Sequence, residues 1–207
     1  MTKKELPKED IESIEVVERV VLHQGFVSLE KLSYRCQSFT GEARLVKDHE
    51  VLLRTPAVVV LPYDPVADTV VLVEQYRSGP VAADCGPACL REVVAGMLDS
   101  GEQPLDSAQR ELAEETGLQA QTWTPIARYW VSPGATTERI YAFCAIVDSS
   151  SVASFAGVKA EGEDLRTVVL KREQALANCM QAVFANSATL ICLQWLSLHV
   201  NDLREQC

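Results

Sequence analysis

Three glutamates lie within five positions of one short stretch of the sequence. They are Glu111, Glu114 and Glu115, in the run RELAEETGL that ends with Gly117 and Leu118. On a helix, these three side chains would fall within an arc of about 100°, so their carboxylates could converge on one point. Such a cluster suits Mg²⁺ or Mn²⁺, which take oxygen ligands and bridge to phosphates. The alternative is a solvent-exposed acidic helix face. Taken without the surrounding sequence, this run favours that alternative.

A helix is expected to carry these glutamates. It begins near Pro104, whose fixed φ suits a first-turn position, and it stops at Gly117, which suits the left-handed residue after a helix. Arg110 lies four residues before Glu114 and could pair with a carboxylate and hold it in place.

The rest of the chain alternates between short apolar runs and helical patterns. Residues 14–51 form β-like runs that predict a small antiparallel subdomain, and residues 57–76 predict a hairpin that feeds a core. A loop over residues 78–87 precedes a strand-like run at 90–98, and further strands are expected at 126–131, 139–147 and 165–170. A helix follows the last of these strands, and the final helix is expected at 187–205, with its apolar face packed in the core.

Composition excludes several classes of protein. A net charge of -10 in 207 residues argues against general nucleic-acid binding, because neutralising phosphates needs an excess of Lys and Arg. Seven scattered cysteines indicate reduced thiols rather than a disulfide framework. No segment reaches the roughly 18 consecutive apolar residues of a membrane span. We therefore expect a soluble, cytoplasmic protein without nucleic-acid or membrane partners.

The spacing around the glutamates is more specific than the cluster itself. Gly96 is followed by five residues and Glu102, and then by seven residues and the run from Arg110 to Leu118. This pattern resembles the Nudix box at every defining position, including the apolar residues Leu112 and Leu118. The runs LPYDPVADTVVLVEQYR, SPGATTER, AEGED and ATLICLQWL extend the resemblance to the bacterial ADP-ribose pyrophosphatase branch of that superfamily, of which a proline at the position of Pro133 is a mark.

The resemblance implies an α/β fold: a Nudix α/β/α sandwich with a mixed sheet at residues 56–207, plus a small N-terminal antiparallel β subdomain at residues 1–55. That subdomain is expected to serve dimerisation and substrate binding, so a homodimer is predicted.

The resemblance also assigns metal ligands. It implies that Glu111, Glu114 and Glu115, helped by a backbone carbonyl near Ala95, bind two or more Mg²⁺ ions, with Mn²⁺ as a possible substitute. Arg110 is expected among the catalytic residues.

Further roles follow from the same resemblance. Glu102 would be an outer partner of Arg110, and Gly96 would let the backbone pass the ions, as a residue that tolerates unusual φ. Glu161 in the AEGED run is the first choice for the general base, and Glu163 is the second choice. Taken without the resemblance, AEGED is an exposed acidic turn.

Four residues are predicted to contact substrate: Arg77 at a phosphate or the terminal ribose, Glu138 at water or the ribose, Phe26 stacked on a base, and Gly134 in the SPGATTER loop. Where relatives carry a basic pair before the first core strand, this chain has Asp48 and His49, which bears on recognition of the base.

The predicted reaction is metal-dependent hydrolysis of the diphosphate of a nucleotide sugar, ADP-ribose, to AMP and ribose 5-phosphate. The alternative keeps the chemistry and changes the nucleotide sugar, for example to GDP-mannose. A non-catalytic nucleotide-sugar sensor is the hypothesis from a different class.

Overall fold

The computed structural model describes residues 14–38, 40–157, 164–181 and 183–205. The chain divides into two compact units, one formed by residues up to 54 together with 131–138, and the other by residues 55–130 together with those from 139 onward. The loop at 131–138 is grouped with the N-terminal strands, whereas the sequence predicts a single boundary at 55/56.

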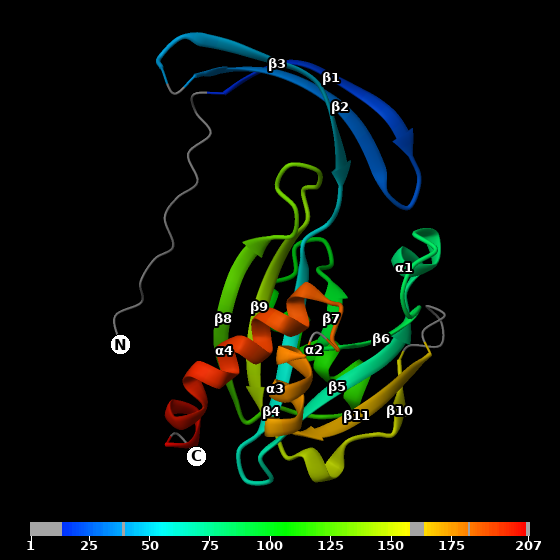
Figure 1. Cartoon of the computed structure of the whole chain (residues 1–207), viewed down its shortest axis with the longest axis vertical. Helices are drawn as coiled ribbons and strands as arrows, with labels where there is room; N and C mark the ends of the chain where they lie inside the picture. Colours follow the sequence, from blue (N-terminus) through cyan, green and yellow to red (C-terminus); the bar gives the residue numbers. More distant parts are fainter. Residues whose placement is uncertain (1–13, 39, 158–163, 182, 206–207) are drawn as a thin grey trace. The chain divides into compact units, whose positions relative to one another are not determined.

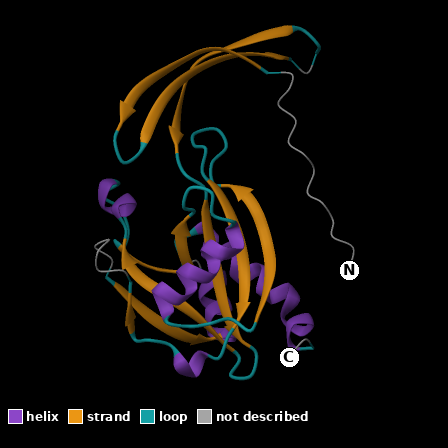
Figure 2. Cartoon of the chain, turned by 180° about the vertical axis from the view of Figure 1, so that it is seen from behind, coloured by secondary structure: helices purple, strands orange, loops and turns teal. Residues whose placement is uncertain are grey.

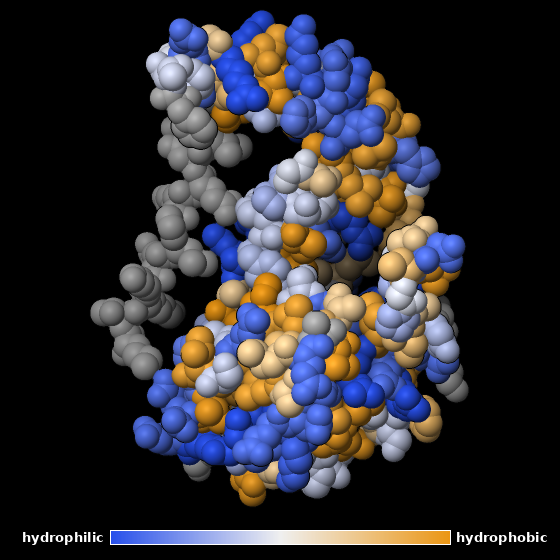
Figure 3. All heavy atoms as spheres, in the orientation of Figure 1, coloured by the Kyte–Doolittle hydropathy of each residue, from blue (hydrophilic) through white to orange (hydrophobic). Residues whose placement is uncertain are grey.

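The first unit contains a three-stranded antiparallel sheet, drawn in blue to cyan in Figure 1. Its strands, in spatial order, are β1 (Glu15–Gln24), β2 (Ser28–Gln37) and β3 (Ala43–Leu53). On the visible face of this sheet, apolar side chains lie among hydrophilic ones (Figure 3). Several apolar residues of β1 are exposed, among them Val16, Val17, Val20, Val21 and Leu22.

The second unit is built on an eight-stranded mixed sheet. Six strands follow one another in the order β10 (Phe155–Ala156), β11 (Leu165–Lys171), β5 (Thr69–Tyr76), β4 (Ala57–Asp64), β9 (Arg139–Ile146) and β8 (Thr122–Trp130). The pairing of β4 with β9 is parallel and the others are antiparallel. Two short strands complete the sheet: β6 (Cys89–Glu92) pairs with β5, and β7 (Val94–Met97) pairs with β4.

Helices cover both faces of this sheet (Figures 1 and 2). The helix α2 (Pro104–Thr116) lies on one face, whereas α3 (Arg172–Met180) and α4 (Ser187–Arg204) lie on the other. The central strand β4 is buried along its whole length. Its residues alternate, so that Val58 and Val60 pack on the side of α2, while Val59 and Leu61 pack on the side of α4. This arrangement confirms the predicted α/β/α sandwich with a mixed sheet and a small N-terminal antiparallel sheet.

Local sequence signals located most elements but not all of them. The run at 90–98 is not one strand, because Val93 separates β6 from β7 and the two pair with different neighbours. A short helix, α1 (Ser78–Ala82), occupies part of the predicted loop. The strand β8 begins at Thr122, four residues earlier than expected. No helix within the described ranges is long and apolar enough to cross a membrane.

Candidate active site

The inner face of α2 carries two carboxylates as well as apolar side chains. Glu111 is 8% exposed and Glu115 is 1% exposed, although a helix face against a sheet is usually apolar. The Oε2 atom of Glu115 accepts a hydrogen bond from the backbone N–H of Ala95 in β7, at 3.3 Å. Leu112, on the adjoining part of the helix surface, packs in the core and anchors the helix on the sheet.

Gly96 in β7 makes room for one of these carboxylates. A Cβ atom at this position would lie 1.8 Å from Oε1 of Glu111, so the carboxylate would have to move from its place. Gly96 is not among the glycines with positive φ. The expectation of an unusual φ was therefore wrong, and the reason for glycine here is the close approach of the Glu111 side chain.

Arg110 connects the carboxylates at the edge of this face. Its Nε and Nη2 atoms donate to the two oxygens of Glu102, each at 3.2 Å, and Nη1 donates to Glu111 at 2.7 Å and to Glu114 at 3.0 Å. A further bond from Nη2 reaches the backbone oxygen of Met97 at 3.2 Å. The predicted contacts of Arg110 with Glu102 and Glu114 are thus both present. The guanidinium, helped by the backbone N–H of Asp99, lowers the pKa of Glu102 to about 2.

The three glutamates of the predicted metal site have different partners in this structure. Within the described part of the chain, no three acidic, histidine or cysteine side chains form a group that could hold a metal ion in this arrangement. One atom, Nη1 of Arg110, donates to both Glu111 and Glu114, while Glu115 accepts from the backbone N–H of Ala95. The donors themselves, carboxylates beside a strand backbone, have the chemistry that Mg²⁺ prefers.

Both candidates for the general base, Glu161 and Glu163, lie outside the described residues. The described chain resumes at Asp164, just before β11.

Arg77 lies in the second unit, at the N-cap of α1. Its Nε donates to Oε2 of Glu92 at 2.7 Å, and the side chain is 39% exposed. The other oxygen of Glu92 accepts from Asn186, at the N-cap of α4. Arg77 is therefore held from β6, and its side chain remains partly exposed.

The other predicted substrate contacts lie in the first unit. Phe26 is 85% exposed, and the guanidinium of Arg54 lies 5.7 Å from its ring centroid. Glu138 lies 3.8 Å from Nε of Arg54, and Gly134 belongs to the same loop as Glu138, with open space around it. Sequence reasoning missed Arg54, which joins residues 26 and 138 although both are distant from it in the chain. Asp48, part of the unusual Asp48-His49 pair, forms an ion pair with Lys31 at 3.2 Å.

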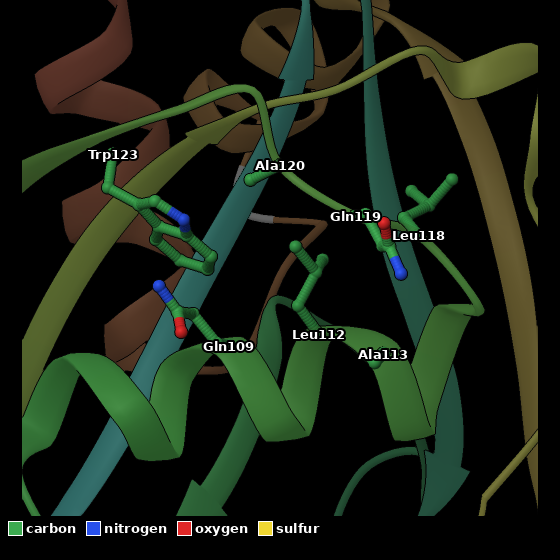
Figure 4. Close-up of a pocket in the computed structure, with 7 residues that line it drawn as sticks. All are labelled: Gln109, Leu112, Ala113, Leu118, Gln119, Ala120 and Trp123. Carbon is green, nitrogen blue, oxygen red and sulfur yellow. The ribbon is translucent and has the colours of Figure 1, made fainter.

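A cavity of about 290 Å³ lies beside α2, but not on its carboxylate face. Figure 4 shows its lining residues, which are Gln109, Leu112, Ala113, Leu118, Gln119, Ala120 and Trp123. At 100° per residue, Gln109 and Ala113 point away from all three glutamates, whereas Leu112 lies about 60° from Glu115. The cavity is therefore separate from the candidate active site.

The family model described as the NUDIX domain matches residues 53–184 of this chain. The chain belongs to the NUDIX domain family. The matched range includes α2, β7 and Arg77, so the carboxylate face described above lies within the family's domain.

Named relatives span nearly the whole chain. The ADP-ribose pyrophosphatase of Escherichia coli is 37% identical over 193 residues, which are 93% of this chain and 92% of that protein. The ADP-ribose pyrophosphatase of Haemophilus influenzae is 36% identical and covers 94% of this chain and 90% of its own length. A GDP-mannose pyrophosphatase of Cronobacter sakazakii is 29% identical, over 90% of this chain and 96% of that protein.

A solved structure described as an ADP compounds hydrolase has the same fold. It matches with a TM-score of 0.63 and 21% identity, and the match covers 92% of this chain and 97% of that chain. At this identity the likeness concerns the fold alone.

Proposed function

We propose that this protein hydrolyses the diphosphate of ADP-ribose, with a divalent metal ion, to give AMP and ribose 5-phosphate. The observation that carries the proposal is the pair of buried glutamates, Glu111 and Glu115, set against β7 where Gly96 makes room for a carboxylate. The ADP-ribose pyrophosphatases that resemble the chain over nearly its full length support this choice of substrate.

The metal ligands proposed are Glu111, Glu114, Glu115 and the backbone carbonyl of Ala95, for two or more Mg²⁺ ions, with Mn²⁺ as a substitute. Bound ions would polarise the phosphoryl oxygens, lower the pKa of the attacking water and stabilise the leaving phosphate. Arg110 holds the carboxylates of Glu111 and Glu114 in this role through the two contacts described above.

The hydrolytic step needs a proton acceptor. Water attacks one phosphorus, its oxygen forms the new P–O bond, the bond between the bridging oxygen and that phosphorus breaks, and the water proton passes to a carboxylate. Glu161 is the proposed base and Glu163 the second choice. The assignment is decided by which glutamine variant lowers the maximal rate by orders of magnitude while leaving substrate binding nearly intact.

Four residues are proposed to contact the substrate. The terminal amino groups of Arg77 suit a phosphate. Phe26 offers an exposed ring for stacking on the base, with the guanidinium of Arg54 close to it. Glu138 and Gly134 are proposed near the ribose.

The second candidate substrate is another nucleotide sugar such as GDP-mannose. The GDP-mannose pyrophosphatases among the relatives, together with the Asp48-His49 pair, favour retaining it. The catalytic residues would be unchanged. A non-catalytic sensor is less favoured, because all box glutamates are present.

A homodimer is part of the proposal. The exposed apolar residues of β1 offer a surface that a second copy could cover. The measurement is the solution mass by light scattering, with twice the 22.8 kDa chain mass as the expected result. The free state of the six described cysteines is consistent with the proposed cytoplasmic location.

The substitution Glu115→Gln tests the catalytic assignment. It removes a proposed metal ligand at nearly constant size, so turnover should fall by about 100-fold or more while the protein stays folded. Turnover with Mg²⁺ and the far-UV circular dichroism spectrum measure the two quantities. Retained turnover with unchanged metal affinity would contradict the ligand set.

A further inference from the structure

Glu92 is a buried carboxylate held by donors from two separate elements of the second unit. It ends β6 and is 2% exposed. One oxygen accepts from Nε of Arg77 and the other from Nδ2 of Asn186, each at 2.7 Å. A buried carboxylate requires such partners, because its removal from water is unfavourable unless the charge is paired and hydrogen-bonded.

Asn186 can present only its amino group to Glu92. Its side-chain oxygen caps α4, where it accepts from the backbone N–H of Thr189 at 3.0 Å and from its hydroxyl at 3.2 Å. Rotating the amide would lose this cap and set an amino group against the N–H of Thr189. The orientation of Asn186 is therefore fixed by the start of α4.

Both oxygens of Glu92 must consequently be acceptors. A glutamine at this position would turn its amino group toward either Arg77 or Asn186, and two donors would face each other. The structure thus requires a carboxylate at position 92, and an amide of the same shape does not replace it.

The same contacts fix the direction of Arg77. Its guanidinium is planar and rigid, so holding Nε at Glu92 sets where the two terminal amino groups point. The two terminal amino groups of Arg77 donate no hydrogen bond to any of the described residues. They have the geometry to donate to two oxygens of one phosphate. The chain then continues from Glu92 through Val93, whose N–H donates to Thr189, into β7 with Ala95.

We propose that Glu92 is a positioning residue which, held by Asn186, aims the guanidinium of Arg77 at the substrate diphosphate. The inference rests on the proposed function, in which Arg77 binds a phosphate. Glu92 itself touches no substrate.

The test is a double-mutant cycle in steady-state kinetics with ADP-ribose and Mg²⁺. The variants are Glu92→Gln, Arg77→Gln and the two combined. The matched control is Asp68→Asn, the same acid-to-amide change at a carboxylate paired with Arg172 and Arg204 in the turn between β4 and β5. An asparagine suits the positive φ of 53° at this position.

The expected result has three parts. Glu92→Gln raises KM about tenfold with kcat nearly unchanged, and it has no further effect once Arg77 is glutamine. The double variant Glu92→Gln/Asn186→Asp should have a KM within about threefold of the wild-type value. In this variant the amino group of the glutamine donates to the new aspartate, and its oxygen accepts from Arg77. The aspartate still caps α4. The control leaves KM unchanged.

Other results overturn the proposal. An equal change of KM in both Arg77 backgrounds would indicate a merely structural role, and a lower KM would mean that Glu92 competes with the phosphate for Arg77. If Glu92→Gln does not fold, Asn186→Asp replaces it in the cycle. This variant places the new carboxylate against that of Glu92, and it keeps the N-cap of α4. The same additive result would then overturn the positioning role.

The two proposals fail separately. Wild-type protein that releases no AMP from ADP-ribose contradicts the proposed function only. The double-mutant cycle is then measured by calorimetry, as dissociation constants for ADP-ribose and GDP-mannose. If the losses of affinity in the two single variants add up in the double variant, the positioning role is overturned. Absence of binding to either nucleotide sugar by the wild type overturns both.

Discussion

Gly96 and Glu111 depend on each other at the scale of single residues. The glycine lies on β7 and the glutamate on α2, and the carboxylate occupies the space that a Cβ atom would take. The spacing of the two residues was visible in the sequence, but the reason for it was not. Only the packing of a strand against a helix shows that the glycine is needed for the space and not for its φ.

Gly96→Ala should therefore impair catalysis more than stability. The new methyl group would lie 1.8 Å from Oε1 of Glu111, so the carboxylate must move by an ångström or more. We expect kcat to fall by about 100-fold, since displacements of that size have such effects. Turnover and the melting temperature are the measurements. Gly79→Ala is the control, because a Cβ there meets no atom within 4 Å; unchanged kcat in Gly96→Ala would contradict the account.

The pairing of Glu102 with Arg110 should be lost only in acid. The pKa of Glu102 falls from 4.5 to about 2, so the folded protein binds fewer protons at this group than the unfolded chain between these values. Its contribution to stability is complete above pH 4.5 and is lost as the pH falls toward 2. The melting temperatures of wild type and Glu102→Gln, measured in EDTA, should differ by a constant amount at neutral pH and approach each other below pH 4.5. A gap that persists down to pH 2 would contradict the assignment.

At the scale of elements, the sequence predicted best where a local signal marks each end. The bounds of α2 follow from Pro104 and from Gly117, whose φ is 71°. The division of residues 90–98 between two strands was not predictable, because it depends on β5 and β4 diverging after their two paired positions. The helix α1 was missed because glycine and proline in SGPVA suggest a loop.

The apolar face of the final helix, α4, should contribute to stability and not to substrate binding. Leu196 is fully buried in the cluster between α4 and the sheet, whereas Leu198 on the same helix is 80% exposed. Leu196→Ala should lower the free energy of unfolding by about 2–5 kcal/mol. Leu198→Ala should change it by less than about 0.5 kcal/mol. Urea unfolding measures both, and KM should stay unchanged in each; equal effects of the two variants would contradict the packing described.

For the whole molecule, the family, the fold class and the chemistry could be predicted from the box and the runs around it. The partners of the predicted residues could not, because they come from distant parts of the chain. Arg54 beside Phe26, and Asn186 behind Glu92, are separated from these residues by 28 and 94 positions, and no local pattern connects them.

Product analysis distinguishes the proposed reaction from its alternatives. The purified protein is incubated with Mg²⁺ and a panel of ADP-ribose, GDP-mannose, ADP-glucose, NADH and diadenosine polyphosphates, each with an EDTA control, and the products are separated and identified. We expect rapid, EDTA-sensitive release of AMP and ribose 5-phosphate from ADP-ribose. Preference for GDP-mannose would keep the catalytic residues and replace the substrate, and the absence of EDTA-sensitive hydrolysis across the whole panel would contradict the account.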